Sequence, residues 1–391
     1  VKTIRMIRQR LERELLSRGY TAGVPDAWQF VAVDVPNVED TRGPLATVKG
    51  VRYVGLTDQN SSYKGDNGAD ARLANSALMN GYFSQWRPDP ENVHTNIVVG
   101  AGQQRAVGRV VASVFHAKLK AVIAQVASAC ANGGGLVECA SAMGIALKPG
   151  ARRPQPLVVL VSSLGGGAGS GIFLDVADML RMSAQGNNTW LQSNLCSLLY
   201  DPSVFDKDGT TLETGVAPNS LAAIAELVAG QWEPWPRPIV LSDFQGNLGN
   251  YSGVEYPFLV GSSNGVLSYS EPEQVYSATA EAISSWVLDP DVSAQIESFT
   301  FGNWGQKSVT STLPLHGGAG TRMPLSAIGF SRVGLGRRRF ALYAEERMAR
   351  LAVERMLTLH HTAAVREGRQ KEMDAAIERV QRHFVQRVRE H

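Results

Sequence analysis

The stretch LVSSLGGGAGSGIFLDVADML (residues 160–180) decides the fold, because it places five glycines in seven positions between an apolar segment and a helical one. A strand that turns through glycines into a helix leaves backbone N–H groups bare at the positive end of the helix dipole. Phosphate groups bind at such points. The alternative is a turn whose glycines only let the helix pack closely against the strand. The segment therefore predicts a phosphate-binding turn or a packing turn.

Two common phosphate-binding motifs do not fit this stretch. Gly166 and Gly171 have the spacing of a Walker A loop, but Ile172 stands where that motif requires lysine. The dinucleotide fingerprint GxGxxG fails as well, because its third glycine would fall on Ser170. The turn is therefore of another kind.

A second glycine turn, VVGAGQQRAVGRV (98–110), also follows an apolar segment and precedes a helix. Two such turns at one edge of a sheet could contact two parts of a polyphosphate. Neither turn carries a lysine, so backbone amides and a metal ion would have to hold the phosphates.

Apolar strand-like segments alternate with helix-like segments along most of the chain. The expected strands lie in segments 28–36, 94–102, 155–163, 195–205 and 256–264, and the expected helices in 1–19, 106–130, 172–182, 218–230 and 271–288. Such alternation predicts an α/β fold with a parallel sheet and helices on both faces. Ligands of such sheets bind at the carboxyl ends of the strands.

The composition limits the function classes. The 391 residues, with 44% hydrophobic and 19% charged residues, suit two globular domains, and a net charge of +2 makes nucleic acid an unlikely partner. Cys130, Cys139 and Cys196 lack metal-ligand spacing, so we assign no metal ligands and expect a reducing, cytoplasmic setting. No apolar run reaches the roughly 18 residues of a membrane span.

Several segments, in order, resemble the tubulin and FtsZ superfamily of GTPases, and bacterial tubulin-like proteins most closely. The segment GGGAGSG (165–171) departs from the family's GGGTGSG loop only at Ala168, and GAGQQRAVGR (100–109) is similar to an FtsZ-type segment. The other matching segments are VAVDVP (31–36), ETGVAPNSLAAIAEL (213–227), FLVGSSN (258–264) and the central helix at 271–288.

The resemblance implies a bound GTP or GDP, with Mg²⁺ beside the phosphates. It assigns Asp34 to the metal or phosphates, Glu213 to the ribose and Asn264 to the guanine, with Gln274 as a further candidate at the base. A core or surface role is an equal alternative for Gln274. The residues implied at the phosphates are Gly100, Ala101, Gly102, Gly165, Gly166, Gly167, Ala168, Gly169, Ser170 and Gly171.

In this family an acidic residue of the next subunit completes the hydrolytic site. The segment LDPDVSAQI (288–296) follows the central helix, so Asp289 and Asp291 are the candidate catalytic residues. Self-association into protofilaments would then switch hydrolysis on. An Asp-Pro-Asp sequence is also an ordinary helix start. Together with Ala168, this leaves a non-catalytic, tubulin-like scaffold as the alternative function.

The resemblance divides the chain into a nucleotide-binding domain (1–270), a linking helix (271–288) and a partial second domain with a helical tail (289–391). The tail from residue 337 is basic, with 13 Arg/Lys against 8 Asp/Glu, and is expected to pack on the second domain or bind protein partners. The chain opens within a helix, so we expect the family's first strand and first glycine loop to lie upstream of it. The segment GSSNG (261–265) also matches a hydrolase nucleophile elbow, but no helix follows at once.

Overall fold

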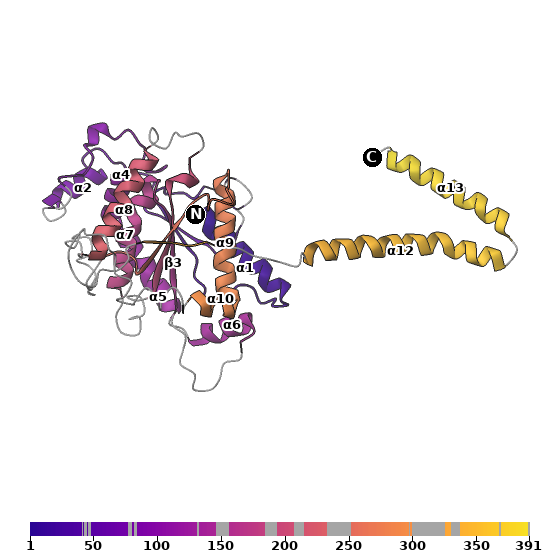
Figure 1. Cartoon of the computed structure of the whole chain (residues 1–391). Coiled ribbons are helices and arrows are strands. Elements are labelled where there is room, and N and C mark those ends of the chain that lie inside the picture. The colour runs from indigo at the N-terminus through magenta and orange to yellow at the C-terminus, as the bar shows by residue number, and fades with distance from the viewer. Residues whose placement is uncertain are drawn as a thin grey trace. The chain divides into compact units, whose positions relative to one another are not determined.

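Figure 1 shows the computed structural model of the chain. It describes residues 1–40, 42, 45, 48–76, 80–81, 84–130, 133–145, 156–183, 194–206, 215–232, 252–296, 298, 325–329, 337–366 and 369–389. The chain forms two compact units, Val1–Phe330 and Ser331–His391. The domain boundaries expected after residues 270 and 288 stay predictions.

A parallel sheet forms the centre of the first unit. Its strands are, in spatial order, β3 (Val158–Ser163), β4 (Leu195–Tyr200), β5 (Tyr256–Val260) and β6 (Ser326–Ala327). Two further strands, β1 (Val31–Asp34) and β2 (Arg52–Gly55), pair in parallel with each other. Every pair among these strands is parallel, so the expected α/β class is confirmed.

Helices cover both faces of the sheet because successive strand residues point to opposite sides. In β4, Leu195 and Leu199 join the core under one helical layer, whereas Cys196 and Leu198 join the core under the other. The first layer contains α4 (Arg105–Val114), α5 (His116–Cys130), α7 (Gly167–Met182) and α8 (Val216–Trp232), and the second contains α1 (Lys2–Ser17) and α9 (Pro272–Leu288) (Figure 1).

Helices α1 and α9 run parallel, with matched polar contacts along their length. Lys2 Nζ lies 2.6 Å from Glu273 Oε1, and Arg10 Nη2 lies 2.8 Å from Glu281 Oε1. At the far end, Arg18 donates a 2.7 Å hydrogen bond to the carbonyl oxygen of Leu288. Residues of α1 therefore meet residues of α9 at a nearly constant offset in the sequence.

The segment expected as one helix over 106–130 forms two helices. α4 ends at Phe115, which has φ −106° and ψ 21°, and α5 begins at His116. The two helices meet at an angle of 72°. The imidazole Nδ1 of His116 lies 2.8 Å from the Ser113 carbonyl oxygen, beside the break. The apolar periodicity continues across this break and does not reveal it.

The strand expected at 94–102 is wrong, because this segment forms turns. The side chain of Asn96 accepts a 3.0 Å hydrogen bond from the Val98 amide, and the Asn96 carbonyl accepts from the amides of Val99 and Gly100. These bonds fold the segment back on itself, with Ile97 buried and Val99 exposed. An Asn side chain that competes for backbone amides favours a turn over a strand.

Smaller elements complete the first unit. They are α2 (Ala69–Asn75), the 3₁₀ helix Pro90–Asn92, α6 (Gly133–Met143), the 3₁₀ helix Pro202–Val204 and α10 (Pro290–Gln295). The second unit consists of α12 (Arg337–Arg366) and α13 (Gln370–Arg389). The helical tail is thus confirmed as helix, and within it large apolar side chains such as Phe340 and Phe384 are exposed.

Among the described residues, no single helix has both the length and the apolar character to cross a membrane. The bent pair α4 and α5 passes that test only when its two helices are taken together, on length and composition alone.

Burial of α1 against the sheet and α9 can be tested with two leucines of the same helix. Leu11 is 2% exposed and Leu16 is 52% exposed. We expect Leu11→Ala to lower the free energy of unfolding by about 3 kcal/mol, because it removes buried methyl groups and leaves a cavity. Leu16→Ala should change it by less than about 0.5 kcal/mol. Urea denaturation measures both, and equal effects would contradict this packing.

Candidate functional site

The carboxyl ends of β3, β4 and β5 meet at one edge of the sheet, where the first glycine turn begins. Ser163, Tyr200 and Val260 lie side by side as the last residues of these strands. The Leu164 amide donates to the Tyr200 carbonyl, and the Asp201 amide donates to the Val260 carbonyl. The three loops that leave this edge are therefore fixed to one another by their backbones.

The first glycine turn leads directly into α7. The hydroxyl of Ser163 accepts hydrogen bonds from the amides of Gly165 (3.1 Å) and Gly166 (3.3 Å). Gly166 is the N-cap of α7, and no side chain caps this helix end. The first-turn amides of Gly167, Ala168 and Gly169 have no carbonyl partner inside the helix. Such amides can accept an anion, and the predicted phosphate contacts at this helix start stay predictions.

Other glycines of both turns serve close packing of α4 against α7. A Cβ at Gly108 would lie 2.3 Å from the carbonyl oxygen of Gly167, and a Cβ at Gly167 would lie 2.7 Å from the backbone nitrogen of Gln104. Gly171 would meet the backbone of Arg105 in the same way. Gly100, in contrast, has no heavy atom within 4 Å of such a Cβ. The packing interpretation of the glycine motif therefore holds for Gly108, Gly167 and Gly171. The phosphate-binding interpretation stays a prediction.

The second glycine turn is held against the first by a side chain of α8. Gly102 and Gln103 adopt left-handed conformations, with φ 56° and 59°. The Nδ2 group of Asn219 donates to the Gln103 carbonyl (2.6 Å) and to the Gly165 carbonyl (3.1 Å). One amide group therefore sets the distance between the two turns.

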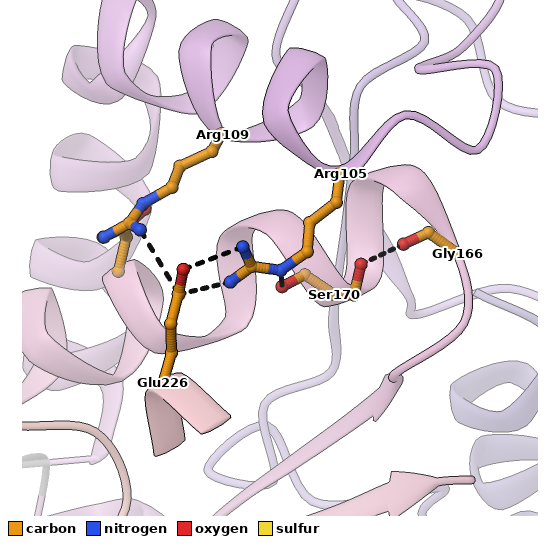
Figure 2. A network of polar contacts seen from close by, with 6 residues as sticks. Arg105, Arg109, Gly166, Ser170 and Glu226 are labelled. Carbon is orange, nitrogen blue, oxygen red and sulfur yellow. Dashed lines mark hydrogen bonds and ion pairs between the residues drawn. The ribbon is translucent and has the colours of Figure 1, made fainter. Parts of the chain in front are cut away.

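Below the turns, a network of charged groups joins α4, α7 and α8 (Figure 2). Arg105 donates to the Ser170 carbonyl (3.1 Å) and pairs with Glu226 (2.9 Å), while the Ser170 hydroxyl donates to the Gly166 carbonyl. Arg109 contacts Glu226 (3.3 Å). The network thus connects the start of α7 to the middle of α8.

The network continues into the core. The guanidinium of Arg109 donates to both oxygens of Asp175, at 3.1 and 3.2 Å, and lies over the ring of Trp86 with 5.2 Å to the centroid. Burial raises the pKa of Asp175, and the charge of Arg109 opposes that shift. The network thus extends from Glu226 of α8 through Arg109 to the buried carboxylate of α7.

Comparison with protein families agrees with this geometry: a family model described as tubulin-like matches residues 1–354. The chain belongs to the tubulin-like family. Comparisons with curated proteins and with solved structures find no match. The resemblance to tubulin-type proteins is therefore confirmed, and the matched region extends from the first unit into α12.

In this tubulin-like chain, several residues that were predicted to bind the nucleotide accept hydrogen bonds from nearby backbone amides. Asp34 ends β1, and its Oδ1 accepts a 2.7 Å hydrogen bond from the Val35 amide, while burial raises its pKa. Asn264 Oδ1 accepts from the amides at 266 and 267, closing an exposed turn. Gln274 Oε1 accepts from the amides at 270 and 271 as part of a capping box. Glu213 lies outside the described residues. The nucleotide-binding roles of these four residues stay predictions.

The two candidate catalytic acids lie at the far end of α9 from the glycine turns. The first turns of α9 adjoin the edge described above, because the rings of Tyr200 and Tyr276 are 5.1 Å apart. Asp289 follows the helix 13 residues after Tyr276, about 20 Å further along at 1.5 Å per residue. Its carboxylate caps α10 through the amides of Asp291 (3.0 Å) and Val292 (3.4 Å), and Asp291 is exposed in the first turn. One chain cannot bring these acids to its own turns.

Sequence reasoning missed three residues that hold the turns. Asn219 joins the two turns through its side-chain amide. Arg105 and Glu226 were not singled out. One signal was present: Arg105 and Arg109 stand four positions apart directly after a glycine turn, which puts two cations on one face of a helix. Nothing in the sequence indicates that Glu226 of α8 faces them.

The packing role of the motif predicts different effects for two glycines. Gly108→Ala should lower the free energy of unfolding by about 2 kcal/mol, because displacing α7 costs more than the roughly 1 kcal/mol gained in helix propensity. Gly100→Ala should change it by less than about 0.5 kcal/mol, since its Cβ meets open space. Urea denaturation compares them, and an unchanged or higher midpoint for Gly108→Ala would contradict the close contact.

A second buried acid, Asp178, lies one turn beyond Asp175 in α7. Its Oδ1 accepts a 2.6 Å hydrogen bond from the Gly253 amide. Burial raises the pKa of Asp178 to about 7, and the hydrogen bond from Gly253 opposes the shift. The folded chain thus holds this proton more tightly than the unfolded chain, in which aspartate titrates near pH ~3.9.

The free energy of unfolding should therefore include a term from Asp178 that is largest below about pH 4 and declines until about pH 7. We expect Asp178→Asn to lack this decline. Between pH 5 and 7 the stability of the wild type should fall relative to the variant by up to about 1.4 kcal/mol per pH unit. Urea denaturation at several pH values tests this, with exposed Asp66→Asn as the control. Parallel pH profiles for wild type and Asp178→Asn would rule it out.

Proposed function

We propose that this tubulin-like chain binds a guanine nucleotide at its two glycine turns and is a self-assembling GTPase. The observation that carries the proposal is the uncapped start of α7, which adjoins the second glycine turn in a chain of the tubulin-like family. Backbone amides take the place of a P-loop lysine. Asn219 and the Arg105–Glu226 pair hold these amides in position before a ligand binds.

The residues present fit a Mg²⁺ ion that is held mainly by the nucleotide phosphates and water, with few protein ligands. The described residues contain no group of three His, Cys, Asp or Glu side chains that could hold a metal. Mg²⁺ commonly takes one or two carboxylates and completes its shell with phosphate oxygens and water. Asp34 would be the carboxylate of this kind, and the ion would supply charge neutralisation for the phosphates. Glu213 and Asn264 are the proposed contacts to ribose and guanine.

Hydrolysis is proposed to require a second copy of the chain. Asp291 is exposed in the first turn of α10, beyond the end of α9 that is far from the turns. A head-to-tail contact that brings one copy's α10 onto the next copy's turns leaves free ends, so it propagates into a protofilament. In it, Asp291 orients the attacking water, and Asp289 holds the α10 helix start through its cap.

The second candidate function is a tubulin-like scaffold that binds nucleotide without hydrolysis. It is favoured by the engagement of Asp289 in capping, which leaves one free acid in the segment. Ala168 in place of the family's threonine favours it as well.

Phosphate release from GTP, measured against protein concentration, separates the two functions. For a self-assembling GTPase we expect the rate per molecule to rise steeply above a threshold concentration. Asp291→Asn should lower that rate at least tenfold while GTP affinity is kept, because the variant loses only the water-orienting carboxylate. The matched control is Asp66→Asn, another exposed acid, which should hydrolyse GTP like the wild type.

A flat rate near zero with GTP still bound would leave the scaffold function. Absence of GTP binding would overturn both candidates and leave the glycine turns with packing alone.

A further inference from the structure

A cavity of about 310 Å³ lies at the opposite end of β1 from Asp34, between α1 and the segments that lead into β1 and β2. The residues that shape it are Arg8, Asp26, Trp28, Phe30, Gly50 and Arg52. Its volume is at the lower end of the range for pockets that bind small molecules. None of these residues belongs to the glycine turns, so the cavity is independent of the proposed nucleotide site.

Arg8 is the unusual residue of this cavity. Its Nη1 atom is buried and has no hydrogen-bond partner in the described chain. The guanidinium lies over the ring of Phe30, with 5.6 Å from Cζ to the centroid. Burial lowers the pKa of Arg8, and the nearest acids, Glu12 and Asp26, only partly oppose that effect. Buried donors of folded proteins almost always have an acceptor, so an acceptor from outside the chain is expected here.

Because Gly50 has no side chain, the guanidinium of Arg8 can lie directly beside it. It has φ +81°, and a Cβ at this position would lie 2.8 Å from Arg8 Nε. The backbone at the start of β2 therefore passes directly behind the charged group. The guanidinium is held between this backbone and the Phe30 ring.

The charges and walls of the cavity indicate which acceptor fits. Arg8 and Arg52 contribute two positive charges and Asp26 one negative charge, so the lining carries a net charge of +1. Arg52 already donates a 2.5 Å hydrogen bond to Gln125. A monoanion balances this lining, whereas a dianionic phosphate would be repelled by Asp26. Trp28 and Phe30 offer aromatic surface to an apolar body.

We propose that this cavity binds a small organic monoanion, a carboxylate on a compact apolar or aromatic body. The carboxylate accepts a charge-assisted hydrogen bond from the unpaired Nη1 atom of Arg8. Arg52 adds positive charge at the rim, and the apolar body lies against Trp28. The site recognises charge and shape together.

The probe for the test is 4-fluorobenzoate, observed by fluorine NMR as it binds the folded chain. We expect saturable binding to the wild type and at least a tenfold loss of affinity for Arg8→Met, since a charged hydrogen bond is removed. Arg13→Met is the matched control on the same helix, because Arg13 is exposed and donates a hydrogen bond to the Gln9 carbonyl. It should bind like the wild type. Arg52→Gln should lose affinity severalfold and keeps α1 intact.

Thermal unfolding separates a binding role of Arg8 from a structural one. Removal of a buried donor without a partner should leave the melting temperature of Arg8→Met unchanged or raised. The proposal is overturned if 4-fluorobenzoate does not bind the wild type, or if Arg8→Met binds it as well as Arg13→Met. Equal binding of 4-fluorobenzyl alcohol, which lacks the charge, would overturn it too, as would displacement by inorganic phosphate at the same concentration.

Discussion

The backbone contact between α4 and α7 is the constraint on which the rest of the site depends. Gly108 and Gly167 face each other with no room for a single methyl group between them. If the helices moved apart, Asn219 could no longer reach carbonyls of both turns, and Arg105 could not reach Ser170 and Glu226 together. The packing of α4 against α7 thus determines the geometry of the two turns. Amides held in this way need little ordering when a ligand arrives.

The charged groups below the turns act on the same helices. Arg109 is shared between Asp175 and Glu226 and is shielded by Trp86. Buried ion pairs add little net stability compared with apolar packing, but loss of one partner leaves the other charge buried and unpaired. The network therefore favours one arrangement of α4, α7 and α8 over alternatives that an apolar interface would tolerate. Asp178, one turn further along α7, accepts a hydrogen bond from the Gly253 amide and so ties this helix to the segment before β5.

The sequence predicted the parts of the structure that follow from local periodicity. The strands around Val33, Leu160, Leu198 and Phe258 and most helices could be predicted from apolar patterns, and the glycine motif marked the edge of the sheet that carries the candidate site. The break at Phe115 and the turn at Asn96 could not, because both lie within apolar patterns that continue across them.

Contacts between segments that are far apart in the sequence could not be predicted, for a different reason. The pairing of Arg105 with Glu226 joins residues 121 positions apart, and the orphan nitrogen of Arg8 exists only once β1 and β2 have folded around it. Such groups are identified by what surrounds them in space.

The parallel pairing of α1 and α9 has a mechanical consequence. Contacts at a constant sequence offset, from Lys2 with Glu273 to Arg18 with Leu288, couple the two helices along their whole length. The two helices therefore form one packed unit that runs from the edge of the sheet with the glycine turns to the opposite edge. A shift of α1 along its axis relative to α9 would therefore have to break contacts near both ends and the middle of the pair at once.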